Sequence, residues 1–164
     1  MSNELQDRVN YLYDRTIISE TIHRFFMALD EKAWDDIPEL LDSEFLLAAA
    51  TVTGSTPERQ PIKQFIEGLV ARNGGFAGTT HLNPGHIIDI DGDRAHVKAH
   101  MYCPHWVDET DAGMYLAYGR YDIDLVRTGD RWVLTDLVIH IDGARGDAQT
   151  VYAIAAERMM KGTS

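Results

Sequence analysis

The stretch GTTHLNPGHIIDIDGDRAHVKAHMY, residues 78–102, decides the fold class that we predict for this chain. Over residues 95–102 small or apolar side chains alternate with polar ones, the period of two that is typical of a strand with one buried face. The tripeptide Asp-Gly-Asp at 91–93 has the composition of a tight turn, and it follows an apolar segment that contains Ile88 and Ile90. The stretch therefore predicts an antiparallel hairpin with one face toward a core.

The rest of the chain divides mainly into helices before this hairpin and strands after it. Apolar residues recur every three or four positions in segments that predict amphipathic helices, namely residues 18–29, 34–41, 62–70 and 151–159. Uncharged or alternating segments that predict strands lie at residues 45–52, 115–127 and 132–141. Segregated runs of this kind indicate an α+β domain whose helices pack on one face of an antiparallel sheet.

Composition limits the kind of protein. With 164 residues and 45% hydrophobic side chains, the chain suits a single domain, which we take to span residues 1–164. The net charge of −11 repels phosphate backbones and anionic lipids, so we expect no nucleic acid and no membrane as partners. The single cysteine, Cys103, cannot form an intrachain disulfide, and residues 1–10 lack the apolar core of a signal peptide. We therefore expect a cytoplasmic protein.

Three stretches of the chain resemble the SnoaL-like branch of the nuclear transport factor 2-like superfamily. They are FFMALDEKAWDDIPELLDSEF at 25–45, the stretch at 78–102 quoted above, and YGRYDIDLVRTGDRWVLTDLVIH at 118–140. The resemblance implies a cone-shaped α+β barrel, with helices packed on a strongly curved, mostly antiparallel sheet. It also implies a mostly apolar pocket that takes a small hydrophobic molecule. Because the superfamily includes dehydratases, isomerases and cyclases, the fold does not select one chemistry.

Two residues match catalytic positions of the relatives with the most similar motifs: scytalone dehydratase, bile-acid dehydratase and hexachlorocyclohexane dehydrochlorinase. The resemblance makes His81 the base that takes a proton from carbon and Asp30 the carboxylate that orients it. The pairing is physically sound, because the ordinary pKa of histidine, ~6.5, lies near neutral pH. A carboxylate on one ring nitrogen also fixes the tautomer and stabilises the imidazolium. On residue type alone, Asp30 is equally a helix-capping residue, and His81 a structural or exposed histidine.

Strand periodicity supplies further candidates. His105 has the parity of the small and apolar residues of its strand, so it faces the interior, where the resemblance makes it the acid that protonates a leaving group. If Pro104 breaks the alternation, His105 lies on the rim instead. We assign substrate contacts to Tyr121, Asn83 and Phe26. The alternatives are a buried tyrosine with a locally bonded hydroxyl, and an Asn-Pro-Gly turn at Asn83.

Other catalytic positions of those relatives are apolar in this chain. The tyrosine near the aspartate of the dehydratases is matched by Phe25 and Leu29, and the arginine on the last strand of the dehydrochlorinase by Leu137. We expect no metal, because the i, i+2 pair of His140 and Asp142 lacks a third ligand. We expect no cofactor, because the chain contains no glycine-rich phosphate loop and no dinucleotide fingerprint.

The sequence thus predicts a cofactor-independent lyase of the dehydratase type, or an isomerase, acting on a small hydrophobic cyclic substrate through a His–Asp general-base dyad. Two alternatives stay open: a non-catalytic small-molecule-binding domain, and a structural small subunit of a ring-hydroxylating dioxygenase. We also expect a homo-oligomer, with a dimer favoured and a trimer as the alternative. The expected contact is an exposed sheet face that carries Tyr118, Val126 and Trp132.

Overall fold

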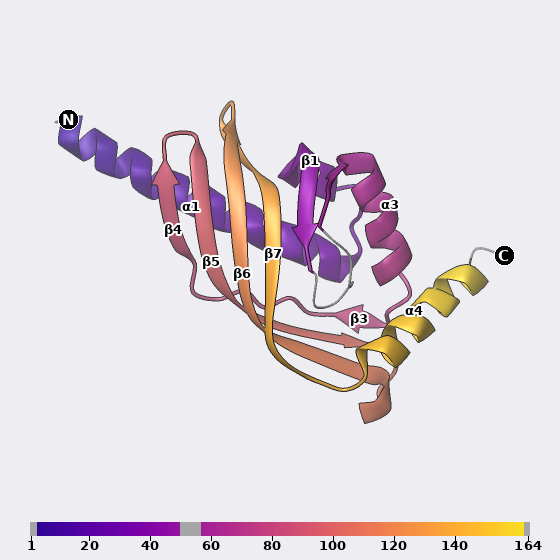
Figure 1. Cartoon of the computed structure of the whole chain (residues 1–164). Coiled ribbons are helices and arrows are strands. Elements are labelled where there is room, and N and C mark those ends of the chain that lie inside the picture. The colour runs from indigo at the N-terminus through magenta and orange to yellow at the C-terminus, as the bar shows by residue number, and fades with distance from the viewer. Residues whose placement is uncertain (1–2, 50–56, 163–164) are drawn as a thin grey trace.

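A computed structural model of the chain describes residues 3–49 and 57–162, and Figure 1 shows the order of its elements. The helices are α1 (Asn3–Glu31), α3 (Ile62–Asn73) and α4 (Ala148–Gly162), with the short 3₁₀ turns η1 (Ile37–Leu40) and η2 (Asp111–Gly113). The strands are β1 (Leu41–Ala48), β2 (Arg59–Pro61), β3 (Gly78–Thr79), β4 (Ile87–Asp91), β5 (Arg94–Trp106), β6 (Met114–Thr128) and β7 (Arg131–Arg145). The predicted α+β class is confirmed.

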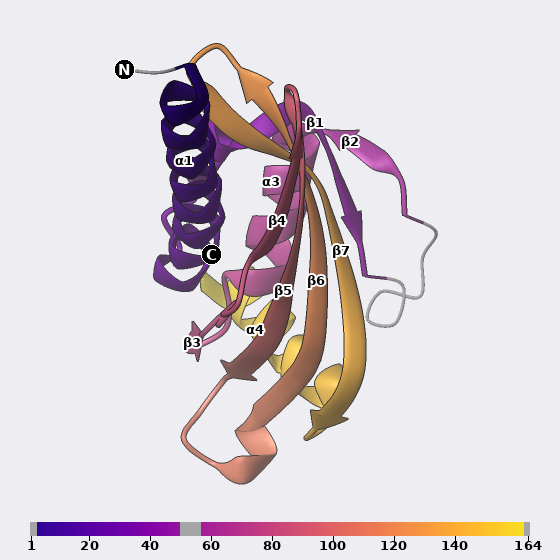
Figure 2. The ribbon, with the colours of Figure 1, turned by 90° about the vertical axis from the view of Figure 1, so that its left-hand side faces the viewer.

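The strands form one curled sheet in the order β2-β1-β7-β6-β5-β3, and β4 also pairs with β5. β1 and β7 run parallel, and the other pairings between described strands are antiparallel. Figure 2 shows the long strands bending around α1, α3 and α4, which lie on the side toward which the sheet curls. The result is a half-barrel that is open enough to hold a cavity between the sheet and the helices.

The alternation predicted for β5 holds along the whole strand. Residues 94–106 pair with residues 114–126 of β6 without a register shift. Pro104 therefore does not change the direction in which the following side chain points. Cys103 and His105 lie together on the buried face, each about 5% exposed or less. This face is the concave side of the sheet, where the core and the cavity lie.

The core lies between α1 and the concave face of the sheet. Ile18, Ile22, Phe25 and Phe26 form the buried stripe of α1, and each of these side chains is at most 2% exposed. Burial of such a side chain contributes roughly 1.5–3 kcal/mol to stability. The first half of α1 projects beyond the sheet and leaves Leu12 62% exposed.

Two predicted elements differ from the structure. The helix predicted at 34–41 is only the turn η1, because Leu41 already has extended backbone (φ −115°, ψ 156°) and pairs with Leu134 of β7. Pairing with the sheet thus overrides the helical spacing of the apolar residues. The apolar run at 45–52 belongs in part to β1, which starts directly after η1, and the end of the run lies outside the described residues.

Trp132 was expected on an exposed sheet face, and this is wrong. The side chain is 2% exposed, its indole N–H donates to Asp14 of α1 at 3.1 Å, and the Arg127 guanidinium lies over its ring at 4.4 Å. Arg127 also donates to both oxygens of Asp14, at 2.8 and 2.7 Å. This cluster fixes α1 to the sheet, and Tyr118, 42% exposed, remains on the outer face.

α4 packs closely on the segment that follows α3. Val151 and Ala155 of α4 are fully buried. The carbonyl of Ala155 lies so near Gly75 that a Cβ at position 75 would collide with it. The position of α4 is therefore set by backbone contact, which only glycine permits at this point.

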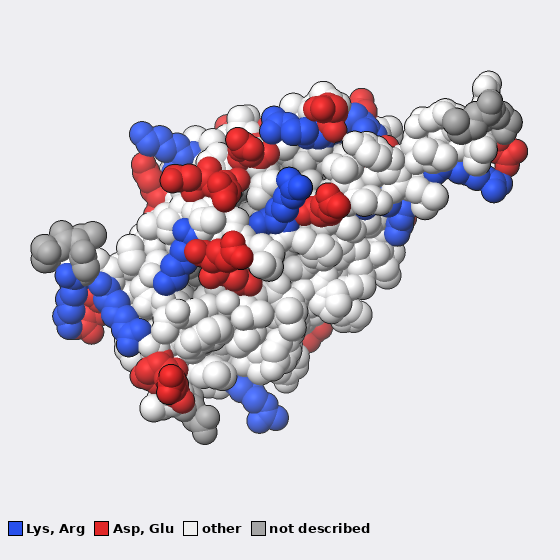
Figure 3. Space-filling model, turned by 180° about the vertical axis from the view of Figure 1, so that it is seen from behind, with Lys and Arg blue, Asp and Glu red and all other residues white. Residues whose placement is uncertain are grey.

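The surface carries interspersed charges. On the face shown in Figure 3, Lys and Arg side chains lie among Asp and Glu and do not gather into a continuous basic patch. Among the described helices, none is long and apolar enough to cross a membrane.

Candidate functional site

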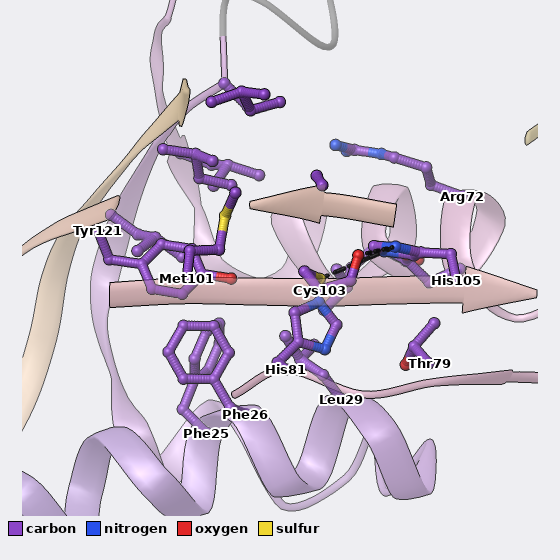
Figure 4. A pocket seen from close by; sticks show the side chains of 18 of the residues that line it. Phe25, Phe26, Leu29, Arg72, Thr79, His81, Met101, Cys103, His105 and Tyr121 are labelled. Atoms are coloured by element: carbon purple, nitrogen blue, oxygen red, sulfur yellow. Dashed lines mark hydrogen bonds between the residues drawn. The ribbon is translucent and has the colours of Figure 1, made fainter. Parts of the chain in front are cut away.

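A largely apolar cavity lies between the concave face of the sheet and the helices, and Figure 4 shows it from close by. Its apolar wall includes Phe25, Phe26, Leu29, Leu47, Leu69, Met101, Leu137 and Ile139. Its polar lining comprises Arg72, Asn73, Thr79, His81, Cys103, His105, Tyr115, Tyr121 and Tyr152. An apolar cavity with a few convergent polar groups is the usual form of a small-molecule site.

His81 and Asp30 are in direct contact at this cavity. The His81 Nδ1 atom lies 2.6 Å from Asp30 Oδ1, and the His81 backbone N–H donates to Asp30 Oδ2 at 2.8 Å. The hydroxyl of Thr79 donates to Asp30 Oδ1, also at 2.8 Å. Asp30 stands in the last turn of α1, where the helix dipole disfavours a negative charge. Its three donors offset that cost and fix the carboxylate behind the His81 ring.

The short strand β3 brings His81 to Asp30. Gly78 pairs with Trp106 of β5, and Thr79 pairs with His105. Thr79 stands two residues before His81 in the chain. A Cβ at position 78 would collide with the Trp106 ring, so glycine lets β3 approach β5 this closely. This pairing therefore brings the segment that carries His81 to the C-terminal end of α1, which carries Asp30.

Asp30 and His81 each stabilise the charged form of the other, so their pKa values shift in opposite directions. Burial tends to raise the pKa of Asp30, but the hydrogen bonds and charge of His81 outweigh burial and lower it. Burial likewise tends to lower the pKa of His81, yet the negative charges of Cys103 and Asp30 raise that pKa to about 9. At neutral pH, His81 is thus an imidazolium between two acidic groups.

Cys103 is the second of these groups. Its Sγ atom lies 3.8 Å from each ring nitrogen of His105, and the donor atoms of His81, Cys103 and His105 all lie within 4.8 Å of one another. Burial favours the neutral thiol, but the nearby charge of His81 lowers the Cys103 pKa to about 6. Within the described residues, His81, Cys103 and His105 form the group of possible metal ligands whose donor atoms lie close enough to bind one ion. We interpret it as an imidazolium–thiolate pair, because Asp30 and Cys103 already neutralise His81.

His105 lies beside this pair and is bonded at both ring nitrogens. Its Nδ1 lies 3.2 Å from the Cys103 carbonyl oxygen, and its Nε2 lies 3.4 Å from the Tyr152 hydroxyl. The His81 and His105 rings meet edge to face with centroids 5.4 Å apart. Burial raises the pKa of Tyr152 far above neutral pH, so its hydroxyl keeps its proton and can donate it to a hydrogen bond.

Phe26 and Tyr121 line the cavity next to His81. The Phe26 ring stacks on His81 at 5.6 Å and on Tyr121 at 4.8 Å between centroids. Burial and the Cys103 charge raise the pKa of Tyr121, which is 1% exposed. Both residues line the cavity, and their contact with a substrate stays a prediction.

Asn83 does not line the cavity and instead forms hydrogen bonds within the loop that carries His81. Its amide donates to the His81 carbonyl at 3.1 Å, and its oxygen lies 3.0 Å from His86 Nε2. It is absent from the lining of the main cavity and instead borders a small surface pocket with Phe26 and His81. Its contact with substrate stays a prediction, and its observed role is to hold the loop that carries His81.

Cys103, Arg72 and Tyr152 are polar lining residues that the sequence does not identify as site residues. Cys103 has no cysteine partner in the chain, and its parity with His105 already predicts that both lie on one face. Tyr152 and Arg72 lie on helices where only the apolar stripe was used for prediction. No spacing rule connects them to His81, because the chain brings them there only through the packing of α3 and α4.

Comparison with known proteins now defines the class. The family model for the SnoaL-like domain matches residues 10–138, so the chain belongs to the SnoaL-like family of the nuclear transport factor 2-like superfamily. Among solved structures, the Kfla4162 protein from Kribbella flavida is 30% identical, with a TM-score of 0.79, and the alignment covers 88% of this chain and 98% of that one. No protein of curated function gives a significant match.

Two further structures share the fold at lower identity. A putative scytalone dehydratase from Novosphingobium aromaticivorans is 15% identical, with a TM-score of 0.72 and coverage of 84% of this chain and 89% of that one. A hexachlorocyclohexane dehydrochlorinase is 11% identical, with a TM-score of 0.72 and coverage of 84% and 91%. At this identity the similarity shows that the fold is related to that of dehydratases and dehydrochlorinases and shows nothing about substrate.

Proposed function

We propose that the protein is a cofactor-independent lyase or isomerase that removes a proton from carbon in a small hydrophobic cyclic substrate. The observation that carries this proposal is the 2.6 Å contact between His81 Nδ1 and Asp30 Oδ1 at the wall of an apolar cavity. Because Nδ1–H donates to the carboxylate, Nε2 is the basic atom of the neutral ring. A base positioned in this way typically contributes ~10²–10⁴ to the rate of proton transfer.

In a dehydration, Nε2 of His81 takes the proton and the electron pair of the C–H bond forms the new double bond. The C–O bond on the neighbouring carbon breaks as this double bond forms, and the leaving oxygen takes a proton to depart as water; the acid that this step requires is the imidazolium form of His105. Tyr152 orients His105 through its hydroxyl. In an isomerisation, the proton held by His81 returns to a different carbon instead.

The raised pKa of His81 predicts how activity depends on pH. With a pKa of about 9, roughly one molecule in a hundred has a neutral His81 ring at pH 7. That neutral ring is a stronger base than free imidazole, which favours abstraction from weakly acidic carbon. In a reaction that needs no acid catalyst, kcat/KM should therefore rise with pH, with a slope of one on a logarithmic scale, until about pH 9.

The base can be tested without the natural substrate. 5-Nitrobenzisoxazole is a flat apolar molecule whose ring opens when a base removes its carbon-bound proton. The electron pair of the C–H bond completes a nitrile, the N–O bond breaks, and a coloured cyanophenolate forms. The phenolate needs no acid catalyst, so the probe reports on the base and does not depend on His105. We expect saturable turnover by the wild type and a loss of ~10²–10⁴ in His81→Ala.

The exposed outer face of the sheet offers a matched control. His96 Nδ1 lies 2.7 Å from Asp124 Oδ1, with the two side chains 40% and 51% exposed. His96→Ala removes the same kind of pair without touching the cavity, so its rate should equal that of the wild type. Equal rates for His81→Ala and the wild type would refute the proposal. Saturable binding of the probe with no turnover would indicate the ligand-binding alternative instead.

We also propose that the chain forms a homodimer, as predicted from the sequence. The projecting half of α1 leaves Val9, Leu12 and Tyr13 about half exposed or more, on one side of the helix. Light scattering on the purified protein tests this, and a monomer at micromolar concentration would contradict it.

A further inference from the structure

Arg72 is the cationic side chain that lines the cavity, and it has no partner among the described residues. It stands in the last turn of α3, and Figure 4 shows its guanidinium directed across the cavity, opposite the Phe25 and Phe26 side. Its side chain is partly buried. In the described part of the chain, no carboxylate or carbonyl accepts a hydrogen bond from it.

Two other partly buried arginines among the described residues, Arg127 and Arg15, each have a hydrogen-bond acceptor within the protein. Arg127 donates to Asp14 at 2.8 and 2.7 Å and lies over an indole ring. Arg15 donates to the Ile88 carbonyl at 2.8 Å. The segment 50–56, which lies outside the described residues, contains no Asp or Glu that could serve Arg72. A guanidinium that is partly removed from water and lacks a protein partner is available to an anionic group of a ligand in the cavity.

We propose that Arg72 binds a carboxylate on the ligand, and that the cavity takes an amphipathic molecule with a hydrophobic ring body and one carboxylate. The planar guanidinium fork matches a carboxylate with two parallel hydrogen bonds. A single carboxylate fits better than a phosphate, because the net charge of −11 repels multiply charged anions. This inference names the substrate class of the proposed site, but it concerns binding and stands without turnover.

The rest of the cavity orients such a ligand. Tyr152 lies close enough to Arg72 for the guanidinium charge to act on its hydroxyl, so the polar end of the cavity lies there. Phe26 and Tyr121 form an aromatic wall on the opposite side. In Figure 4, His81 lies between Tyr121 and Arg72. A ligand bound at both ends therefore presents to His81 the part of its ring body nearest the carboxylate.

Matched pairs of aromatic ligands test the charge separately from the shape. We would measure dissociation constants by calorimetry for naphthalene-2-carboxylate and its carboxamide, and for equivalent one-ring and steroid-sized pairs. The wild type should bind at least one carboxylate roughly tenfold or more tightly than the matching carboxamide. Arg72→Met should lose this preference and keep its affinity for the carboxamide, while Arg72→Lys should keep part of it.

The control is Arg131→Gln, which removes the same charge from an exposed position at the start of β7. It should leave the preference unchanged. A wild type that prefers no carboxylate in the series, or an Arg72→Met variant that retains the preference, overturns the proposal. His81→Ala should still bind the carboxylate, so loss of the proposed base and loss of the anion site give different results.

Discussion

Replacing Asp30 by asparagine keeps the shape of the side chain and removes the charge that holds His81. The carboxylate accepts bonds from Thr79 Oγ1, the His81 backbone N–H and His81 Nδ1, at 2.8, 2.8 and 2.6 Å. An amide has one oxygen and one NH₂ group. If the oxygen keeps the bond to the backbone N–H, the NH₂ group faces Nδ1. The imidazole must then move its proton to Nε2, and the basic atom is lost from the cavity.

The size of the effect follows from these contacts. A hydrogen bond to a charged group contributes about 1.5–3 kcal/mol, and Asp30→Asn loses one such bond and weakens the others, so we expect a loss of about 3 kcal/mol in the free energy of unfolding. The wrong tautomer should lower the turnover of 5-nitrobenzisoxazole by ~10²–10⁴. The pKa of His81 should also fall, because one of the two charges that raise it is gone.

Three measurements on one protein test this reasoning: urea denaturation, the rate with 5-nitrobenzisoxazole, and nitrogen NMR of the His81 ring. Asp124→Asn is the control, because its partner His96 is exposed and such pairs contribute about 1 kcal/mol or less. An Asp30→Asn protein that, above pH 9 where the His81 ring is neutral, keeps both the wild-type rate and the proton on Nδ1 would refute the role given to Asp30.

Three other perturbations have definite expected outcomes. Titration of the thiolate by its ultraviolet absorbance should give a midpoint near 6 for Cys103, and His81→Gln should raise it because the imidazolium charge is lost; an unchanged midpoint would contradict the ion pair. Cys103→Ala should move the midpoint of the pH–rate profile below about 9, since the thiolate raises the His81 pKa, and a constant midpoint would show that Asp30 acts alone. Gly78→Ala should cost about 1–3 kcal/mol and lower the rate, because a Cβ would displace β3 from Trp106; a thermal melt at the wild-type temperature would argue against this tight contact.

The sequence predicts the fold well where a single hydrophobic periodicity, that of a strand or that of a helix, runs through the whole segment. The alternation in β5 places Cys103 and His105 on the interior face, and the structure has no register shift there. The prediction fails where two tendencies compete. Leu41 has helical spacing with its predecessors, but pairing with Leu134 of β7 draws it into β1. Trp132 is expected on an exposed sheet face, but the register shift in the β6–β7 pairing places it on the same buried face as Leu134, where Asp14 of α1 is its partner.

The candidate site was only partly accessible from the sequence. His81 and Asp30 were paired through the resemblance to a family, because no local rule connects residues 51 positions apart. Arg72 and Tyr152 stand beside the apolar stripes of their helices, where polar side chains are normally exposed. Their direction toward the cavity depends on how α3 and α4 dock against the sheet, which is a tertiary property that single-segment periodicity does not contain.

The contact between Gly75 and the Ala155 carbonyl also limits how the protein can change in evolution. A larger residue at position 75 would push the C-terminal helix outward and carry Tyr152 away from His105. Selection for a bulkier ligand therefore has a single-step route through position 75, which widens the chamber but weakens the contact between Tyr152 and His105. Variants at Leu47 or Leu137, which also line the cavity, would enlarge the same chamber and leave that contact in place.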